Sequence, residues 1–205
     1  AAAVTETKGE EYQRAIAQAA MACAQAGRYN EAYNLLRGVT IPSLAIPGLE
    51  RLWMKTYDED PSGTDEMRAV ITTQLVRFRE AARHPASINM SNRFRTYERM
   101  ANLALARIHT EAGDLWQARK LTGVVDELGK TTESYFNVLL GIYELSGEER
   151  DRRNVVLFLK KHPGQERVFA NRAARLAQTD LALADRPEAA EQQHVIDAVT
   201  TIYRS

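Results

Sequence analysis

Apolar residues recur along the whole chain with the three- and four-residue spacing of one helical face. Two of the clearest stripes lie in the middle of the chain. One places Met67, Ile71, Leu75, Phe78 and Ala82 on one face, and the other places Phe94, Tyr97, Ala101, Leu105, Ile108 and Ala112. The pattern predicts an all-α fold of about ten helices in about five stacked antiparallel hairpins. The helices are expected over 7–26, 31–39, 49–57, 67–82, 94–112, 114–128, 136–145, a segment ending at 162, 165–184 and 187–203.

Capping residues and prolines set the expected helix boundaries. Asp114 followed by Gln117 has the spacing of a capping box at the start of a helix. Pro42 and Pro47 predict a break before the third helix, because proline disfavours the helical conformation at the residue before it. Gly129 is expected to end the helix that starts after Asp114, since glycine is enriched just beyond helix C-termini.

Several of the expected turns share one local form, in which a small residue stands at the turn and an alanine follows about five residues later. The instances are GRYNEA at 27–32, GDLWQA at 113–118 and DRPEAA at 185–190. Glycine permits the tight reversal of the chain. Ala32, Ala118 and Ala190 would let the second helix of each hairpin approach the first closely. Because one hairpin cannot bury its apolar face alone, neighbouring hairpins are expected to stack.

These hairpins resemble the tetratricopeptide repeat (TPR), a helix–turn–helix unit of about 34 residues, and Gly113 and Gly147 stand one such period apart. The resemblance covers roughly two-thirds of the chain. Degenerate units are expected over 13–46, 99–132, 133–166 and 171–204, and a hairpin that fits the pattern poorly is expected over 47–98. The resemblance implies that residues 1–205 form a single helical-repeat domain, an α-solenoid with a TPR-like superhelix.

TPR-like proteins bind extended peptides or helices on the concave surface that the first helices of their hairpins form. The resemblance therefore implies a protein–protein interaction module, such as an adaptor, scaffold or assembly factor. In its register, the groove-facing positions are Arg14, Gln18, Arg107, Asn137 and Arg175. Three arginines among them favour an acidic ligand or a terminal carboxylate, because a guanidinium binds a carboxylate through two parallel hydrogen bonds.

Charge gives an alternative hypothesis. The 27 basic and 27 acidic side chains balance, so the net charge does not indicate nucleic acid or an anionic membrane as a partner. One arginine-rich segment nevertheless contains Arg77, Arg79, Arg83, Arg93, Arg95, Arg99 and Arg107 against only Glu80 and Glu98. The alternative is a helical regulator that binds nucleic acid through this segment. Because the interleaved Phe78, Phe94 and Tyr97 belong to apolar stripes, they are expected in the core, which favours an acidic protein partner.

Composition and motifs give little support to catalysis. The chain has 30 alanines but only 11 glycines and 6 prolines, which favours helices over strands. The four histidines show no metal-ligand spacing. His84 and His162 precede prolines at expected helix ends, where a cation interacts well with the helix dipole. The sequence contains neither a G-x-S-x-G motif nor a glycine-rich phosphate loop. We therefore expect no enzyme, no metal and no other cofactor.

The acidic segment 58–66 has some features of a calcium loop. Asp58, Asp60 and Ser62 occupy its first, third and fifth positions, but Ala69 stands where a bidentate glutamate is required. A solvated linker is therefore expected. Cys23 lies among alanines and is expected to be a small buried hydrophobe.

The compartment is left open by the sequence. No segment approaches the roughly 20 consecutive apolar residues of a membrane-spanning helix. The chain begins with three alanines and no methionine, which is compatible with removal of a tag, a neighbouring domain or a secretory signal. A soluble protein, either cytoplasmic or exported after signal removal, is expected, and its oligomeric state is not predicted.

Overall fold

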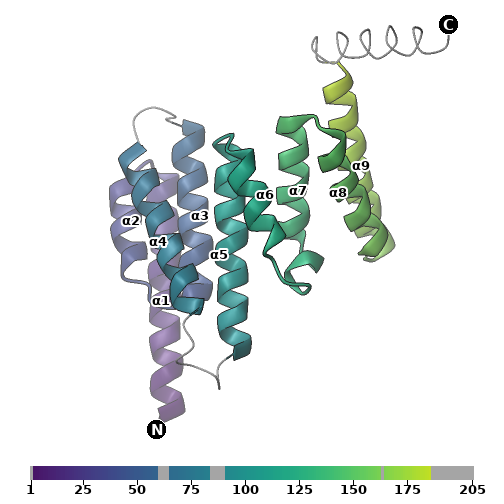
Figure 1. Ribbon diagram of the computed structural model, residues 1–205. Coiled ribbons are helices and arrows are strands. Elements are labelled where there is room, and N and C mark those ends of the chain that lie inside the picture. Colours follow the sequence, from purple (N-terminus) through teal and green to yellow (C-terminus); the bar gives the residue numbers. More distant parts are fainter. Residues whose placement is uncertain (1, 60–64, 84–90, 163, 186–205) are drawn as a thin grey trace, which may run out of the picture. The chain divides into compact units, whose positions relative to one another are not determined.

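The computed structural model describes residues 2–59, 65–83, 91–162 and 164–185 (Figure 1). Within these residues the chain is all-helical, as the sequence predicts, with nine α-helices and a short 3₁₀ turn at Gly129–Thr131. The helices are α1 (Ala2–Gln25), α2 (Tyr29–Arg37), α3 (Pro42–Glu59), α4 (Asp65–Arg83), α5 (Ser91–Glu111), α6 (Leu115–Gly123), α7 (Glu133–Ser146), α8 (Glu149–Lys161) and α9 (Glu166–Ala184). The expected helix over 187–203, with Ala190 and the second half of the 171–204 unit, lies outside the described residues.

The chain divides into two compact units, Ala1–Gly129 and Lys130–Ser205. We call them unit 1 and unit 2 and describe each by itself. In unit 1, α3 packs against both α1 and α5, so the first helices of three hairpins lie side by side (Figure 1). The second helices lie on this layer, since α2 contacts α1 and α3, α4 contacts α3 and α5, and α6 contacts α5. Each helix thus packs on its neighbours along the chain, which is a helical-repeat arrangement.

In unit 2, α7 packs against α8 and α9, and α8 also contacts α9. Their shared core is built from apolar side chains at helical spacing on all three helices. It consists of Phe136, Leu139, Leu140, Tyr143, Val155, Phe158, Leu159, Leu176 and Leu183. Burial of side chains of this size contributes about 1.5–3 kcal/mol each before the entropy of ordering is subtracted. The core therefore stabilises three helices that would be marginal in isolation.

The expected turn glycines adopt the conformation that the hairpin requires. Gly27, Gly113 and Gly147 have φ values of 71°, 77° and 65°, in the left-handed region that residues with a side chain rarely adopt. The alanines that follow the first two, Ala32 and Ala118, are fully buried. Cys23 is buried as well, as predicted. The turn motif therefore identifies two hairpins of unit 1, and Gly147 marks a hairpin turn in unit 2. The third instance of the motif, at 185–190, lies largely outside the described residues.

Three expected helix boundaries are wrong by five residues or more. The first helix begins at Ala2, because the alanine-rich start of the chain favours helix. The expected break before residue 49 is absent from α3, which continues through Pro47. Pro42 stands at the first helical position, where its missing N–H costs nothing. Pro47 cannot bond the carbonyl of Ser43, but Ser43 is exposed and water can satisfy that group. Burial of Ala45, Ile46, Leu49 and Leu52 outweighs this loss.

The third difference concerns α6, which ends at Gly123 rather than near residue 128. The chain after it is held by Asp126, whose Oδ1 accepts a hydrogen bond of 2.8 Å from the backbone N–H of Gly129. Gly129 is buried, and a Cβ there would lie 2.6 Å from Cδ and 2.7 Å from Cγ of Arg99. Gly129 therefore allows this turn to approach α5 closely, and it does not end a helix as expected.

Candidate functional site

The groove-facing residues predicted on the first helix lie in a groove of about 410 Å³ between α1 and α3 in unit 1. Met21, Leu44 and Pro47 are half-buried and form its apolar floor. Its other lining residues are Arg14, Ala17, Gln18, Ala22, Gln25, Ser43, Gly48 and Arg51. The predicted Arg14 and Gln18 are thus brought together. Arg51 was missed by the sequence reasoning, because residues 49–57 were expected to follow a chain break.

Two contacts fix the geometry of this groove. Gln13 of α1 holds the start of α3, since its Oε1 accepts hydrogen bonds from the backbone N–H groups of Thr40 (2.8 Å) and Ile41 (3.0 Å). These amides precede the first turn of α3 and would otherwise need another acceptor. Gly48 is buried, and a Cβ there would lie 2.6 Å from Cδ2 of Leu36. A larger residue at position 48 would therefore displace the buried side chain of Leu36 and disturb the packing of α3 on α2.

The charges on the groove favour an anionic ligand. Arg14 and Arg51 are both exposed, and none of the described residues that line the groove is acidic. The Nη2 of Arg14 bonds Oε1 of Glu10 at 3.1 Å, but both side chains are more than half exposed. An exposed pair one helical turn apart contributes only about 0.3–0.5 kcal/mol. Arg14 can therefore exchange this partner for a carboxylate of a ligand at little cost.

Arg107, the third predicted groove residue of unit 1, is engaged elsewhere. Its Nη1 donates to Oε1 of Glu50 on α3 over 3.2 Å. Burial raises the pKa of Glu50 above its ordinary value, and the neighbouring Arg107 charge opposes that effect. The pair therefore links α3 to α5, and Arg107 opposes the protonation of a half-buried carboxylate. Arg107 is not among the residues that line the α1–α3 groove.

In unit 2, the structure brings together the two predicted groove residues, Asn137 on α7 and Arg175 on α9. Nη1 of Arg175 donates to Oδ1 of Asn137 at 2.7 Å and to Oε1 of Glu133 at 3.4 Å. The guanidinium carbon lies 5.3 Å from the ring centroid of Phe136. Arg175 also lines a groove of about 390 Å³ with Glu144, Gln178, Thr179, Ala182 and Leu183. Unlike Arg14, it is therefore held by partners on another helix.

Arg172 is an organising residue of unit 2 that the sequence reasoning missed. Its side chain is buried, it donates to Oε2 of Glu133 (2.8 Å) and to the carbonyl of His162 (3.0 Å), and it lies over the rings of Phe136 and Phe158. The only signal in the sequence is that an arginine stands on the apolar stripe of α9. A single charged residue in such a stripe does not predict which residues it will contact.

A second network links all three helices of unit 2. Asp180 on α9 accepts a hydrogen bond of 2.7 Å from the hydroxyl of Tyr143 and two from Arg152, at 2.9 and 2.8 Å. The hydrogen bond from Arg152 is the main reason why the pKa of Asp180 lies below its ordinary value. Burial and Asp180 together raise the pKa of Tyr143 to about 12. The side chains lie 28 and 37 positions apart in sequence, so helical spacing alone does not reveal the network.

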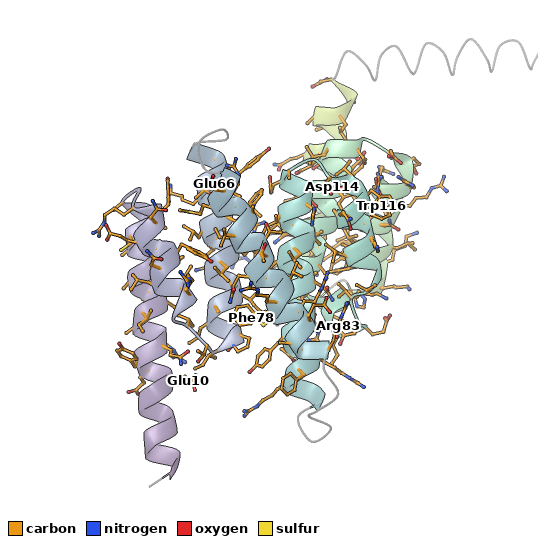
Figure 2. The ribbon with its side chains drawn as sticks, turned by 60° about the vertical axis from the view of Figure 1, so that its left-hand side comes forward. Glu10, Glu66, Phe78, Arg83, Asp114 and Trp116 are labelled. Atoms are coloured by element: carbon orange, nitrogen blue, oxygen red, sulfur yellow. The ribbon has the colours of Figure 1, made fainter. Side chains whose placement is uncertain are left out.

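The arginine-rich segment is largely neutralised. Arg79 pairs with Glu80, Arg83 with Glu80 and Glu98, Arg99 with Asp126, and Arg107 with Glu50. Figure 2 shows Arg83 at the end of α4, from which it reaches Glu98 of α5 over 2.6 Å. Arg77, Arg93 and Arg95 are exposed and form no ion pair within the described part of the chain. The aromatic residues Phe78, Phe94 and Tyr97 are half-buried rather than fully in the core.

The remaining candidates from the sequence have structural roles or lie outside the described residues. His109 Nδ1 lies 3.2 Å from Asp114, whose other oxygen caps α6 at the backbone N–H of Gln117. The ring of His162 packs on Phe158. His84, His194 and residues 60–64 of the acidic segment are not described. Among the described residues, no three His, Cys, Asp or Glu side chains are grouped as metal ligands.

No helix within the described residues is both long and apolar enough to cross a membrane. No protein-family model, curated protein or solved structure matches the chain.

Proposed function

We propose that this protein is an interaction module that binds an acidic segment of another protein in the α1–α3 groove. The observation that carries the proposal is the composition of the groove, in which Arg14 and Arg51 flank a half-buried apolar floor and no lining residue is acidic. An apolar floor offers an anchor for one or two ligand side chains, and the arginines can pair with ligand carboxylates. The groove lies along the layer formed by the first helices, where TPR-like proteins bind their ligands.

The experiment is selection from a displayed library of random peptides, followed by affinity measurements on the selected peptides by fluorescence anisotropy. We expect peptides that are enriched in Asp and Glu around an apolar residue. Arg51→Glu should weaken their binding at least tenfold, which corresponds to about 1.4 kcal/mol. Arg37→Glu is the matched control, because Arg37 is exposed on α2 and does not line the groove. The affinity of the Arg37→Glu variant for the peptides should stay within twofold of that of the wild type. An equal loss in both variants would contradict a local site.

A second pair of variants tests the groove without changing charge. Ala22 is exposed on α1 and lines the groove, so Ala22→Trp should block the groove and reduce peptide binding. Ala19 is exposed on the same helix outside the groove, and Ala19→Trp should leave binding unchanged. If Ala22→Trp folds and binds as well as the wild type, the ligand does not occupy this groove.

Nucleic-acid binding is the second candidate, and the exposure of Arg77, Arg93 and Arg95 favours it. Binding that depends on phosphate contacts weakens steeply with salt. A titration with a single-stranded and a duplex oligonucleotide between about 50 and 200 mM salt tests this. Absence of binding at the low salt concentration would exclude the candidate.

A further inference from the structure

A small polar pocket lies in unit 1 between α5 and the turn that follows α6. Its volume is about 210 Å³. Four of its six lining residues come from one face of α5, and the other two come from the turn. They are Arg95, Glu98, Arg99, Asn102, Val124 and Asp126. Because residues 95, 99 and 102 follow helical spacing, their side chains lie in one row along the pocket.

Asn102 is the unusual member of this row. It is only 2% exposed, and its Oδ1 is buried with no hydrogen-bond partner among the described residues. Buried polar atoms in folded proteins are nearly always hydrogen-bonded, so this atom requires an explanation. An unmade hydrogen bond to a buried acceptor is unfavourable. A ligand in the pocket that carries a hydrogen-bond donor would remove this deficit.

The charges of the pocket are arranged for an anion. Arg99 binds Asp126 through its Nε (2.6 Å) and Nη2 (2.7 Å), which leaves the two N–H groups of Nη1 for another acceptor. Glu98 is bound by Arg83 at 2.6 Å. Both carboxylates are therefore compensated within the protein. Arg95 is exposed and forms no ion pair in the described structure, although its charge also acts on Asp126. Three arginines, Arg83, Arg95 and Arg99, thus interact with the two carboxylates, so the pocket retains a net positive charge.

The position of Arg99 is also fixed by its packing. Its aliphatic carbons lie against the backbone of Gly129, where a Cβ would come within 2.7 Å of them and would also collide with Val125. Asp126 accepts from the N–H of Gly129 with the same Oδ1 that accepts from Nε of Arg99. The guanidinium is thus held in place before any ligand binds, which reduces the entropic cost of binding.

We propose that this pocket binds hydrogen phosphate, with Arg95 and Arg99 donating to its oxygens and its P–OH group donating to Oδ1 of Asn102. The site is independent of the α1–α3 groove. An oxyanion without a proton, such as sulfate, matches the arginines but offers no donor to Asn102. Hydrogen phosphate matches both, because inorganic phosphate keeps at least one hydroxyl near neutral pH. The proposed site should therefore distinguish two ions of the same shape.

Isothermal titration of the full chain with inorganic phosphate and, separately, with sulfate tests the proposal. We expect phosphate to bind at least tenfold more tightly than sulfate. Asn102→Leu, which replaces the amide by an apolar group of similar size, and Arg95→Gln should each weaken phosphate binding at least tenfold. Arg93→Gln is the matched control, since Arg93 is an exposed arginine of α5 outside the pocket. It should change phosphate binding by less than twofold.

Circular dichroism verifies that each variant is folded. If Asn102→Leu does not fold, Arg95→Gln still tests the proposal, because Arg95 is exposed and its replacement removes no hydrogen bond or ion pair found in the described structure. Three results would each overturn the proposal. They are the absence of phosphate binding to the wild type, equal affinity for sulfate and phosphate, and an equal loss in the Arg93 and Arg95 variants.

Discussion

Arg14 in unit 1 and Arg175 in unit 2 are equivalent in the sequence, since both are predicted to face a groove from the first helix of a hairpin. Their surroundings differ. Among the described residues, Arg14 pairs only with Glu10 on its own helix, and both side chains are largely exposed. Arg175 bonds Asn137 and Glu133 on a different helix and lies over Phe136. One cation is therefore available to a ligand, whereas the other contributes to the packing of α9 on α7.

The difference shows that the role of these two exposed arginines is decided by the neighbouring hairpin, which precedes Arg175 and follows Arg14. Glu133 precedes Arg175 by 42 positions, about one repeat plus two helical turns. In unit 1 the corresponding neighbour of α1 is α3, which presents Ser43, Leu44 and Pro47 to the groove and no carboxylate. Because α3 contributes no carboxylate to the lining of this groove, the unit 1 groove is the better candidate for an acidic ligand.

The largest effect is expected from Arg172→Ala in unit 2. The change removes two hydrogen bonds and the contacts with two aromatic rings, so the free energy of unfolding of unit 2 should fall by about 3 kcal/mol. The two tryptophans, Trp53 and Trp116, both belong to unit 1. Tryptophan fluorescence therefore follows unit 1, and far-ultraviolet circular dichroism follows both units.

In urea unfolding of the Arg172→Ala variant, the circular dichroism signal should shift more than the fluorescence signal does. Arg167→Ala on the same helix is the control, because Arg167 is exposed. It should change stability by less than about 0.5 kcal/mol. Equal shifts for the two variants would show that Arg172 does not organise unit 2.

Asp180→Asn should lower the free energy of unfolding by about 2 kcal/mol at pH 7, because Asp180 accepts charge-assisted hydrogen bonds from Arg152 and a bond from Tyr143. The pKa of Asp180 in the folded protein lies below its ordinary value of 3.8. Its contribution is therefore complete above that pH and declines as pH falls below it. The difference between variant and wild type in urea unfolding should be smaller at pH 3 than at pH 7.

A spectrophotometric titration of the tyrosines gives an independent measure of the same contact. Tyr143 should ionise near pH 12 in the wild type. In Asp180→Asn its pKa should fall towards the ordinary value of 10, although burial keeps part of the increase. If the titration curves coincide, the hydroxyl of Tyr143 does not bond Asp180 in solution.

The sequence predicts the hairpins well, because their signals are local. Gly27, Gly113 and Gly147 identify the turns, and apolar spacing identifies the helices that pack there. The prediction at Pro47 is wrong because local propensity favours a break, whereas the buried face of α3 is a tertiary effect. The predicted end of α6 is wrong for a similar reason. Asp126 bonds Arg99 of α5, which lies 27 positions earlier, and Gly129 packs on the same side chain. These contacts between distant positions hold the chain in a turn where the local sequence favours helix.

The candidate site is predictable only in part, for the same physical reason. Arg14 and Gln18 follow from the helical register, and the structure places them in one groove. Whether such a residue is free depends on ion pairs between helices, such as those of Arg107 with Glu50 and Arg175 with Glu133. These pairs join residues 57 and 42 positions apart, and no periodicity within a single helix specifies them.

Matched charge reversals compare the two grooves directly. Arg175→Glu places a carboxylate beside Glu133 and removes the bond to Asn137, so it should cost about 1–2 kcal/mol of stability. Arg14→Glu places a carboxylate one turn from Glu10, where both side chains are exposed, and should cost less than about 0.5 kcal/mol. Circular dichroism for the first variant and tryptophan fluorescence for the second measure the two losses. Equal losses of stability in the two variants would show that Arg175 is no more tightly held than Arg14.

A small effect is also expected for Arg107→Ala, and its dependence on pH identifies its cause. Arg107 is about half exposed, so its pair with Glu50 should contribute about 0.5–1 kcal/mol at pH 7. Burial already holds the pKa of Glu50 above its ordinary value of 4.5, and loss of the Arg107 charge should raise it further. The ionised Glu50 then destabilises the folded state more at neutral pH.

Below pH 4.5, Glu50 becomes protonated in the folded protein with or without Arg107, so the difference in stability should shrink as pH falls. Urea unfolding followed by tryptophan fluorescence at pH 7 and pH 4 measures it, because both residues belong to unit 1. In a Glu50→Gln background the Arg107→Ala change should have almost no effect at either pH. A loss that is the same at both pH values would show that Arg107 acts through its packing on α3 rather than through the charge of Glu50.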